Sequence, residues 1–289
     1  MEWHNVLDPA SPELDRLAER YKLHPLHIED CRHRDQRAKI EDAPGYLFTV
    51  LKPVHINQKG DFVAVDMDVF LGADFLITVE ETECPEVRDL ISRVKKAMAA
   101  ETRPDRIYYR IMDELVDSYL PLLDKLNDTL DELEDKALGS PTPEVLQAIF
   151  SNKRTLIFLR GVLVNTRDLV SHLQRLNCQW VNPDLAPYFR DVYDHVARNL
   201  DMVEIMRDLL AGCLDVYLSS VANRTNQVMK VLTVLGTIAL PALVISGFYG
   251  MNVKGLPGAE SAYGVGIAVA SMALVTGSLL WILKRFDWL

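Results

Sequence analysis

The hydrophobic residues are spread unevenly along the chain, and two uncharged runs stand out near its C-terminal end. Residues 231–250 read VLTVLGTIALPALVISGFYG, and residues 264–283 read GVGIAVASMALVTGSLLWIL. About 20 helical residues span about 30 Å, which is the thickness of the hydrocarbon core of a bilayer. We therefore predict two transmembrane helices, because a pair of such runs close together is not typical of the buried helices of a soluble protein.

Basic residues flank the two runs on one side. Lys230 precedes the first run, and Lys284 and Arg285 follow the second, whereas the intervening residues 251–263 hold a single lysine and no arginine. Cytoplasmic loops of membrane proteins carry the excess of lysine and arginine. We therefore predict a multi-pass protein of the inner or plasma membrane. Both termini are then cytoplasmic, with an extracytoplasmic loop at 251–263 and a basic cytoplasmic tail at 284–289.

Residues 1–105 combine short apolar runs with amphipathic stretches. Three runs rich in β-branched and aromatic residues, separated by turn-forming residues, predict the strands of a small sheet: 46–56, 62–71 and 74–81. Helical patterns at 12–21 and 85–100 flank them. We therefore expect an α/β domain, which is cytoplasmic because no signal peptide precedes it.

Residues 106–182 show two longer helical patterns. Apolar residues recur at helical spacing from Ile107 to about Lys136 and from Pro143 to about Leu176, which predicts an antiparallel helix pair. The first pattern is strongly acidic, with Asp113, Asp117, Asp124, Asp128, Asp131, Glu132, Glu134 and Asp135. These carboxylates form either an ordinary solvated face or a cation-attracting surface near a pore mouth.

A third helical pattern begins near Tyr188, and no proline interrupts it before Pro241, inside the first uncharged run. One helix through this region is about 95 Å long at about 1.5 Å per residue, and neighbouring helices or subunits must cover its apolar stripe. We assign 183–230 to a stalk helix that continues into a transmembrane helix at 231–250, followed by a second at 264–283. The predicted fold is an α+β membrane protein with an N-terminal α/β cytoplasmic domain.

The charge and the motifs exclude several classes of function. The net charge of −10 and the pI near 5.2 argue against a nucleic-acid partner, because phosphate binding needs a basic surface. The four cysteines form no C-x-x-C pair, and no P-loop or G-x-S-x-G elbow appears. A membrane-anchored metalloenzyme built on His24, His27, His33 and Cys31 is a rival interpretation, but its H-E-x-x-H helix is missing. We predict that the protein is not an enzyme.

The four residues Tyr249-Gly250-Met251-Asn252 resemble the Y-G-M-N signature of the CorA family of magnesium channels. Other segments resemble that family in the same order: 24–30, 189–195, 214–220, 226–233 and 284–289. The resemblance implies a funnel-shaped homopentamer, and some oligomer is required because two helices cannot enclose a polar pathway. It also implies uptake of magnesium, and of cobalt, down the electrochemical gradient, gated by cytoplasmic magnesium.

Asn252 suits the selection of a hydrated ion. Magnesium releases its bound water reluctantly. A ring of amide oxygens that accept hydrogen bonds from that water therefore allows faster passage than carboxylates, which hold the ion. A helix C-cap after Gly250 is the alternative role for this asparagine. We assign Tyr249, Gly250, Met251 and Asn252 to ion selectivity.

One face of the first transmembrane helix is the predicted pore lining, because its residues recur at steps of three and four. It comprises Asn226, Met229, Thr233, Gly236, Thr237, Leu240, either Leu243 or Val244, and Gly247. The resemblance adds Leu232 and indicates Met229, Leu232 and Leu240 as narrow positions, where apolar rings close a pore by dewetting. Leu243 stands where the family often has a threonine. Packing against lipid or another helix is the alternative role for part of this list.

Carboxylates also occur where gating is expected. Asp30 and Asp191 match family positions that hold regulatory magnesium between neighbouring subunits, with Glu29 close by. A bridging ion neutralises the repulsion between carboxylates of two subunits and holds the ring shut. An ordinary surface salt bridge is the alternative role for these residues.

Two rival functions remain open. The loop after Asn252 reads VKGLPGAE, and this Gly-Leu-Pro-Gly run resembles ZntB-like zinc transporters, which raises zinc transport, with or without proton coupling. Tyr249, Met251 and the pair Asp30 and Asp191 resemble the magnesium channels instead. The third interpretation is a metal sensor that conducts no ion.

Overall fold

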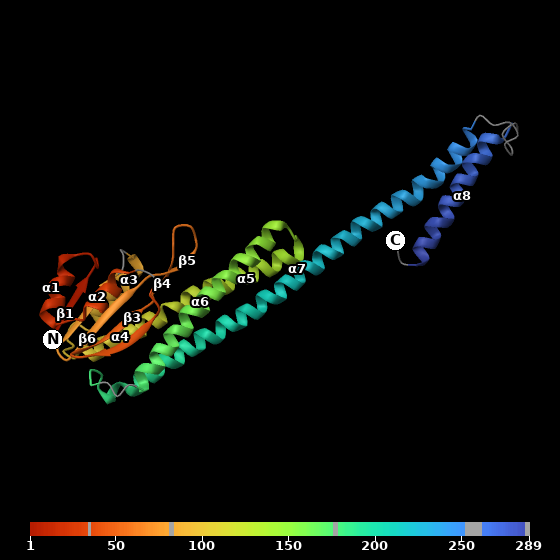
Figure 1. Ribbon diagram of the computed structural model, residues 1–289. Coiled ribbons are helices and arrows are strands. Elements are labelled where there is room, and N and C mark those ends of the chain that lie inside the picture. The colour runs from red at the N-terminus through yellow and green to blue at the C-terminus, as the bar shows by residue number, and fades with distance from the viewer. Residues whose placement is uncertain (34–35, 81–83, 176–178, 252–261, 287–289) are drawn as a thin grey trace. The chain divides into compact units, whose positions relative to one another are not determined.

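The computed structural model describes residues 1–33, 36–80, 84–175, 179–251 and 262–286. The chain divides into two compact units, Met1–Leu214 and Asp215–Leu289. Asn252, Lys254 and the end of the basic tail lie outside the described residues. Figure 1 shows the order of the elements along the chain.

A five-stranded sheet forms the centre of the first unit, with the strand order β1-β7-β6-β3-β2. Its strands are β1 (Glu2–Val6), β2 (Lys39–Ala43), β3 (Tyr46–Leu51), β6 (Met67–Gly72) and β7 (Phe75–Glu80). β1 runs parallel to β7, and the other neighbours are antiparallel. Every residue of β3, β6 and β7 is buried, so these three strands are the inner strands that the apolar runs predict.

The strand prediction is incomplete in two respects. The runs 46–56 and 62–71 each contain two strands, because β4 (Val54–Ile56) and β5 (Phe62–Ala64) form a separate hairpin. In the outer strands β1 and β2, Val6 is the only buried residue. Neither strand therefore shows an apolar run in the sequence. Pairing with an inner strand, and not the local sequence, determines these edge strands.

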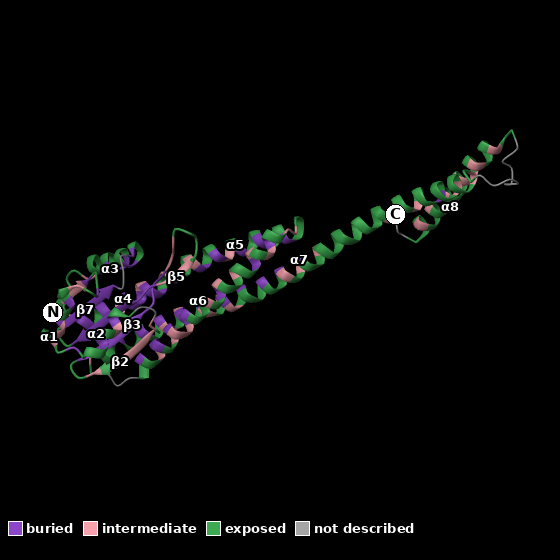
Figure 2. Ribbon diagram, turned by 45° about the horizontal axis from the view of Figure 1, so that its top comes forward, coloured by how far each residue is buried: buried purple, intermediate pink, exposed green. Residues whose placement is uncertain are grey.

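Helices cover both faces of the sheet. On one face, α1 (Pro12–Tyr21) and α2 (Pro25–Arg32) contribute buried residues to a cluster that includes Phe48 and Phe70, both fully buried. On the other face lie α3 (Pro85–Ala97) and α4 (Pro104–Asp117), where Tyr108 Oη lies 2.9 Å from Thr49 Oγ1. The predicted α/β layer is confirmed, and Figure 2 shows its buried centre.

The acidic pattern that predicts one helix from Ile107 to Lys136 forms two helices, α4 and α5 (Tyr119–Gly139). Pro121 explains the boundary at Ser118, because proline has no N–H for the carbonyl four residues earlier and its ring crowds that turn. The second pattern forms α6 (Pro143–Arg175) as predicted.

The last helix of the first unit, α7 (Ala186–Tyr249), has 64 residues and continues into the second unit. A short 3₁₀ turn, Pro183–Leu185, precedes it. The prediction of one long helix running into the first uncharged run is therefore confirmed. The second unit also holds α8 (Gly264–Arg285), and both helices are long and apolar enough to cross a membrane. Figure 2 shows that most residues of this unit are exposed.

A charged network fixes the start of α7 to the start of α4. Arg103 donates to both carboxylate oxygens of Asp105, at 3.0 and 2.6 Å, and to both of Asp184, at 2.7 and 2.9 Å. The backbone N–H of Asn182 also donates to Asp105, at 3.0 Å. Burial opposes ionisation of Asp105, but these hydrogen bonds outweigh it and lower its pKa below the usual value.

We predict that Asp105→Asn destabilises the protein by about 2 kcal/mol at neutral pH, because hydrogen bonds to a largely buried charge are lost. The lowered pKa makes this contribution present above about pH 4 and lost as the pH falls through the pKa of the folded state. Urea unfolding followed by circular dichroism across this range measures it. The control Asp184→Asn removes an exposed partner and should cost less. A pH-independent difference between Asp105→Asn and wild type would contradict this account.

Candidate functional site

The predicted selectivity residues lie at the C-terminal end of α7. Tyr249 ends the helix with its ring 5.7 Å from that of Phe248, and Met251 is exposed. The backbone N–H of Gly250 donates to the carbonyl of Ser246 at 2.8 Å. The structure therefore places three of the four signature residues at a helix end.

Glycine is required at position 250 for a steric reason. A Cβ atom added there would lie 2.9 Å from the carbonyl oxygen of Ser246, which real side chains essentially never do. That oxygen belongs to the backbone of the preceding turn, so it cannot move aside cheaply. Glycine at position 250 therefore lets the backbone pass close to the Ser246 carbonyl oxygen where the chain leaves the helix.

The predicted pore face of α7 is largely uncovered in the single chain. Met229, Leu232 and Leu240 are 60, 68 and 62% exposed, and Asn226, Gly236 and Gly247 are exposed as well. Residues on the other side, such as Val231 and Leu235, are 61 and 59% exposed, whereas Pro241 is buried. One long face of this helix therefore lacks a partner within the described chain.

Four of the predicted pore residues also border α8. Thr233, Gly236, Thr237 and Leu240 line an apolar cavity of about 640 Å³, together with Val275 and Leu279 of α8 and three further α7 residues, Pro241, Val244 and Ile245. The two threonines are half-buried, and their hydroxyls donate to backbone carbonyls one turn earlier, at 2.8 Å each. These threonines therefore lie at the edge of the uncovered face and beside α8, as Leu240 does.

Carboxylates and a histidine meet where α4 lies beside α7. Ligand atoms of Asp113, Asp117 and His195 lie within 4.8 Å of one another. His195 Nδ1 is 3.2 Å from Asp117, and its Nε2 is 3.9 Å from Asp191. We call Asp113, Asp117, Asp191 and His195 the carboxylate–histidine cluster. Carboxylate oxygens suit magnesium, and the imidazole suits cobalt or zinc.

The electrostatics of this cluster favour a cation. Burial and the neighbouring Asp117 raise the pKa of Asp113, although Arg110 donates to it at 2.7 Å. Burial, with the nearby Asp113, also raises the pKa of Tyr109 to about 12. Burial is the larger cause of both shifts, and the neighbouring carboxylates add a repulsion that a bound dication would offset.

From the sequence, only Asp191 of this cluster is assigned to a metal site. Asp113 and Asp117 belong there to an acidic helix face, and His195 only to a family-like segment. Both pairs, Asp113 with Asp117 and Asp191 with His195, are four residues apart, so each pair shares one helix face. That spacing is the available signal, but nothing local indicates that the two faces meet.

The other two predicted regulatory residues lie on α2. Glu29 is exposed, whereas Asp30 accepts a hydrogen bond of 2.8 Å from Lys39 Nζ, which also donates to Glu41 at 2.8 Å. Burial opposes the charge of Lys39, but these two partners raise its pKa overall. Lys39 therefore compensates the charge of Asp30 within the chain. Among the described residues, no group of possible metal ligands includes both Asp30 and Asp191.

The histidines of the metalloenzyme interpretation have structural partners. His24 caps α2 by accepting from the backbone N–H of Leu26, at 3.2 Å. His27 is buried, with Tyr46 Oη at 2.8 Å and Glu41 at 3.1 Å. Burial strongly raises the pKa of the Cys31 thiol, which opposes its use as a thiolate ligand.

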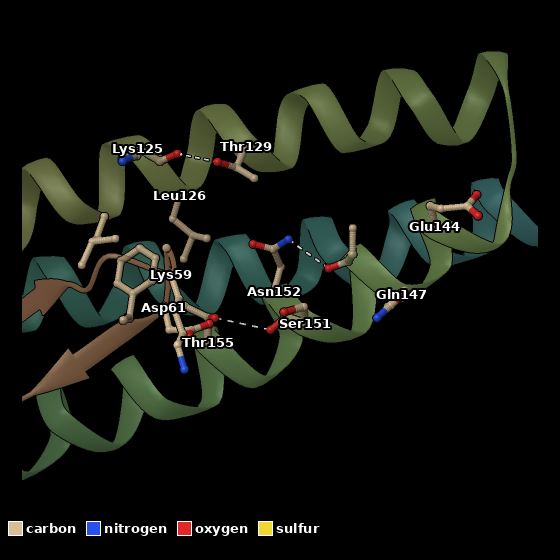
Figure 3. A pocket seen from close by; sticks show the side chains of 14 residues that line it. Lys59, Asp61, Lys125, Leu126, Thr129, Glu144, Gln147, Ser151, Asn152 and Thr155 are labelled. Carbon is tan, nitrogen blue, oxygen red and sulfur yellow. Dashed lines mark hydrogen bonds between the residues drawn. The ribbon is translucent and has the colours of Figure 1, made fainter.

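A polar cavity of about 530 Å³ lies between the β4–β5 hairpin and helices α5 and α6 (Figure 3). Thr129, Asn152 and Thr155 line it, but each donates to a backbone carbonyl of its own helix. These three side chains thus use a donor within their own helices, and we assign no ligand to this cavity.

Comparison with known proteins agrees with this arrangement. The family described as CorA-like Mg2+ transporter protein matches residues 1–285. The cobalt/magnesium transport protein CorA of Thermotoga maritima is 35% identical over 99% of this chain and 83% of its own length. The zinc transport protein ZntB of Yersinia pseudotuberculosis is 27% identical over 62% of this chain and 54% of its own.

A solved structure supports the fold independently. The complete CorA magnesium transporter of Methanocaldococcus jannaschii aligns with a TM-score of 0.86 at 24% identity, covering 99% of this chain and 91% of that one. Members of the matched family are transporters or channels and not enzymes, so the prediction of no enzymatic activity is confirmed. The chain belongs to the CorA family of divalent metal cation transporters.

Proposed function

We propose that the chain forms a homopentameric channel of the inner or plasma membrane that admits Mg²⁺, and also Co²⁺, down the electrochemical gradient. Both termini lie in the cytoplasm, and the loop 251–263 lies outside. The predicted pore face of α7 carries this proposal, because it is uncharged and combines Asn226, Thr233 and Thr237 with apolar residues. Several copies of this face around one axis would enclose a pathway that a single chain cannot.

The two ends of this pathway have different roles in the proposal. At the outer end, a ring of Asn252 amides accepts hydrogen bonds from the water around the ion, and Gly250 brings the chain out of the helix to present that ring. Further in, rings of Met229, Leu232 and Leu240 form a constriction that excludes water when closed. Supporting this, the three side chains are exposed in the single chain.

We predict that Asn252→Ala abolishes Mg²⁺ flux into proteoliposomes without changing the oligomer mass, because the ring of acceptors is lost. Asn252→Asp should bind Mg²⁺ more tightly and conduct more slowly, since a carboxylate holds the ion. Native mass spectrometry provides the control for assembly. Flux of Asn252→Ala at the wild-type rate would remove Asn252 from the selectivity role.

Cytoplasmic Mg²⁺ gates the channel in this proposal. Asp191 faces the Asp30 and Glu29 side of a neighbouring subunit, and a bound Mg²⁺ holds the two subunits together. The carboxylate–histidine cluster supports a cation there, because Asp113 and Asp117 add negative charge beside Asp191. Loss of the ion would leave like charges facing one another across the subunit contact and open the ring.

We predict that Asp191→Lys removes most of the protection from proteolysis that millimolar Mg²⁺ gives the wild-type oligomer, because the lysine repels the ion. Limited proteolysis with and without Mg²⁺ measures the effect. The matched control is Asp124→Lys, which makes the same charge change at an exposed position of α5. Equal protection in Asp191→Lys and Asp124→Lys would exclude Asp191 as a regulatory ligand.

Zinc is the second candidate ion, favoured by two observations. The loop after Asn252 resembles that of zinc transporters, and His195 adds an imidazole, which zinc and cobalt prefer, to the cluster. The carboxylates and the asparagine of the signature fit magnesium better.

Flux into proteoliposomes with a pH-sensitive dye inside separates these functions. We expect Mg²⁺ and Co²⁺ to enter without acidification, because a channel couples ion movement to no proton. Zinc entry with acidification would instead identify a proton-coupled zinc transporter. No flux of any of the three ions would favour a sensor.

A further inference from the structure

Two helices of the first unit carry oppositely charged residues in lines at intervals of seven. Along α6 the line consists of Lys153, Arg160 and Arg167, which we call the basic line. Along α7 it consists of Asp194, Asp201 and Asp208, which we call the acidic line. Residues seven apart occupy nearly the same side of a helix, so each line runs along one face.

Exposed apolar residues accompany both lines. Phe150 and Ile157 of α6 are 47 and 59% exposed, and Ile205 and Leu209 of α7 are 60 and 47% exposed. Phe150 and Ile157 are also seven residues apart, as in the seam of a coiled coil. Each helix therefore offers a lateral face with an apolar line beside a charged one, as at packed helix–helix contacts.

The chain uses these faces for only a few polar contacts of its own, among them Arg160 with Glu204 and Arg207 with Asp208, at 2.5 and 3.3 Å. The buried residues of α6, such as Leu156, Leu159 and Leu163, lie on a different side of the helix from Ile157. Within the described chain, neither Lys153 nor Asp201 forms an ion pair. Arg160 and Arg167 contact the chain's own Glu204 and Asp168, which leaves some of their N–H groups free.

Contacts within one chain fix how the two helices align. Arg160 Nε donates to Glu204 at 2.5 Å, and Gln174 Nε2 donates to the carbonyl of Phe189 at 2.9 Å. These two contacts show that α6 and α7 run antiparallel with nearly constant register. Moving back by one residue along α6 therefore corresponds to moving forward by one residue along α7. Lys153, seven residues before Arg160, therefore lies level with residue 211.

In a ring whose symmetry axis runs parallel to α7, equivalent residues of all copies lie at the same height along that axis. The basic line then meets a neighbour's α7 at about residues 211, 204 and 197, whereas the acidic line lies at 208, 201 and 194. Each acidic residue is three residues from the height of one basic residue, about 4.5 Å along the axis. Long lysine and arginine side chains span that offset. Because both lines repeat every seven residues, all three pairs have this same offset.

The position of α6 also agrees with the proposed regulatory contact. The C-terminal part of the α6 region lies beside β2, and Trp180 Nε1 donates to Asp42 of β2 at 2.9 Å. Lys39 of the same strand holds Asp30 at 2.8 Å. Asp30 and α6 thus belong to one edge of the unit, which is the edge that the proposed gating directs at a neighbour's α7.

We propose that the basic line of α6 docks on the acidic line of α7 of a second copy of this chain, pairing Lys153 with Asp208, Arg160 with Asp201 and Arg167 with Asp194. The contact joins two different surfaces, so it is heterologous, and in the proposed pentamer its rotation closes the ring. The inference rests on the assembly of the proposed function and adds to it a contact between subunits that needs no metal ion.

Two co-expressed variants with different affinity tags test the pairing. One carries Asp208→Asn and the other Lys153→Gln, so a carbodiimide bond between Lys153 and Asp208 can form only between subunits of the two kinds. We expect mass spectrometry of the doubly purified full-length oligomer to find this linked peptide pair. Each variant expressed alone should lack it.

Charge reversal gives a second readout. Lys153→Glu should raise the monomer fraction in detergent by about threefold or more, because like charges then face each other, and Asp208→Lys in the same chain should restore assembly. Lys96→Glu, an exposed lysine on α3, is the control and should change nothing.

The outcomes separate the two proposals. Co-purified tags without the Lys153–Asp208 link, or equal effects of Lys153→Glu and Lys96→Glu, would overturn this interface and leave the oligomeric channel intact. Wild-type protein that is monomeric in native mass spectrometry would overturn the assembly itself, and this contact with it.

Discussion

The protein depends on a helix that its own chain covers only in part. Along α7, side chains such as Val192, Val196 and Val203 are fully or almost fully buried in the first unit, whereas every residue from 221 to 232 is exposed. A helix of this length gains most of its stability from burying an apolar stripe. In the proposed channel, lipid covers one side of this helix and other copies of the helix cover another. In this proposal, both the assembly and the ion pathway follow from the exposed surface of α7.

Proline and glycine shape the membrane end of this helix. Pro241 has no N–H, so the carbonyl of Thr237 loses its helical partner in the middle of the apolar run. Pro241 itself is buried, which places this irregular turn against protein and not against lipid. Gly250 then lets the chain leave the helix where a Cβ would collide with Ser246. Both points lie beside the predicted pathway.

Local sequence determined much of the fold but little of the carboxylate–histidine cluster. Helix α1 begins and ends where predicted because Ser11 caps its first turn and Lys22 adopts the left-handed conformation that ends it. The outer strands escaped prediction, since β1 pairs with a strand more than seventy residues away and buries only Val6. The contact of His195 with Asp117 is similarly long-range. A family resemblance could indicate Asp191, but only the packing of α4 on α7 brings the other ligands to it.

Two kinds of contact between subunits would respond differently to the cytoplasm. Asp30 has Lys39 as a built-in cation, so loss of a bound ion leaves it partly compensated. The carboxylate–histidine cluster has three carboxylates against Arg110 and one histidine, so most of the repulsion after ion loss arises there. The lysine and arginine residues of α6 carry their charge at every Mg²⁺ concentration. A ring held by both could therefore loosen around Asp191 while the contact between α6 and α7 keeps neighbouring subunits together.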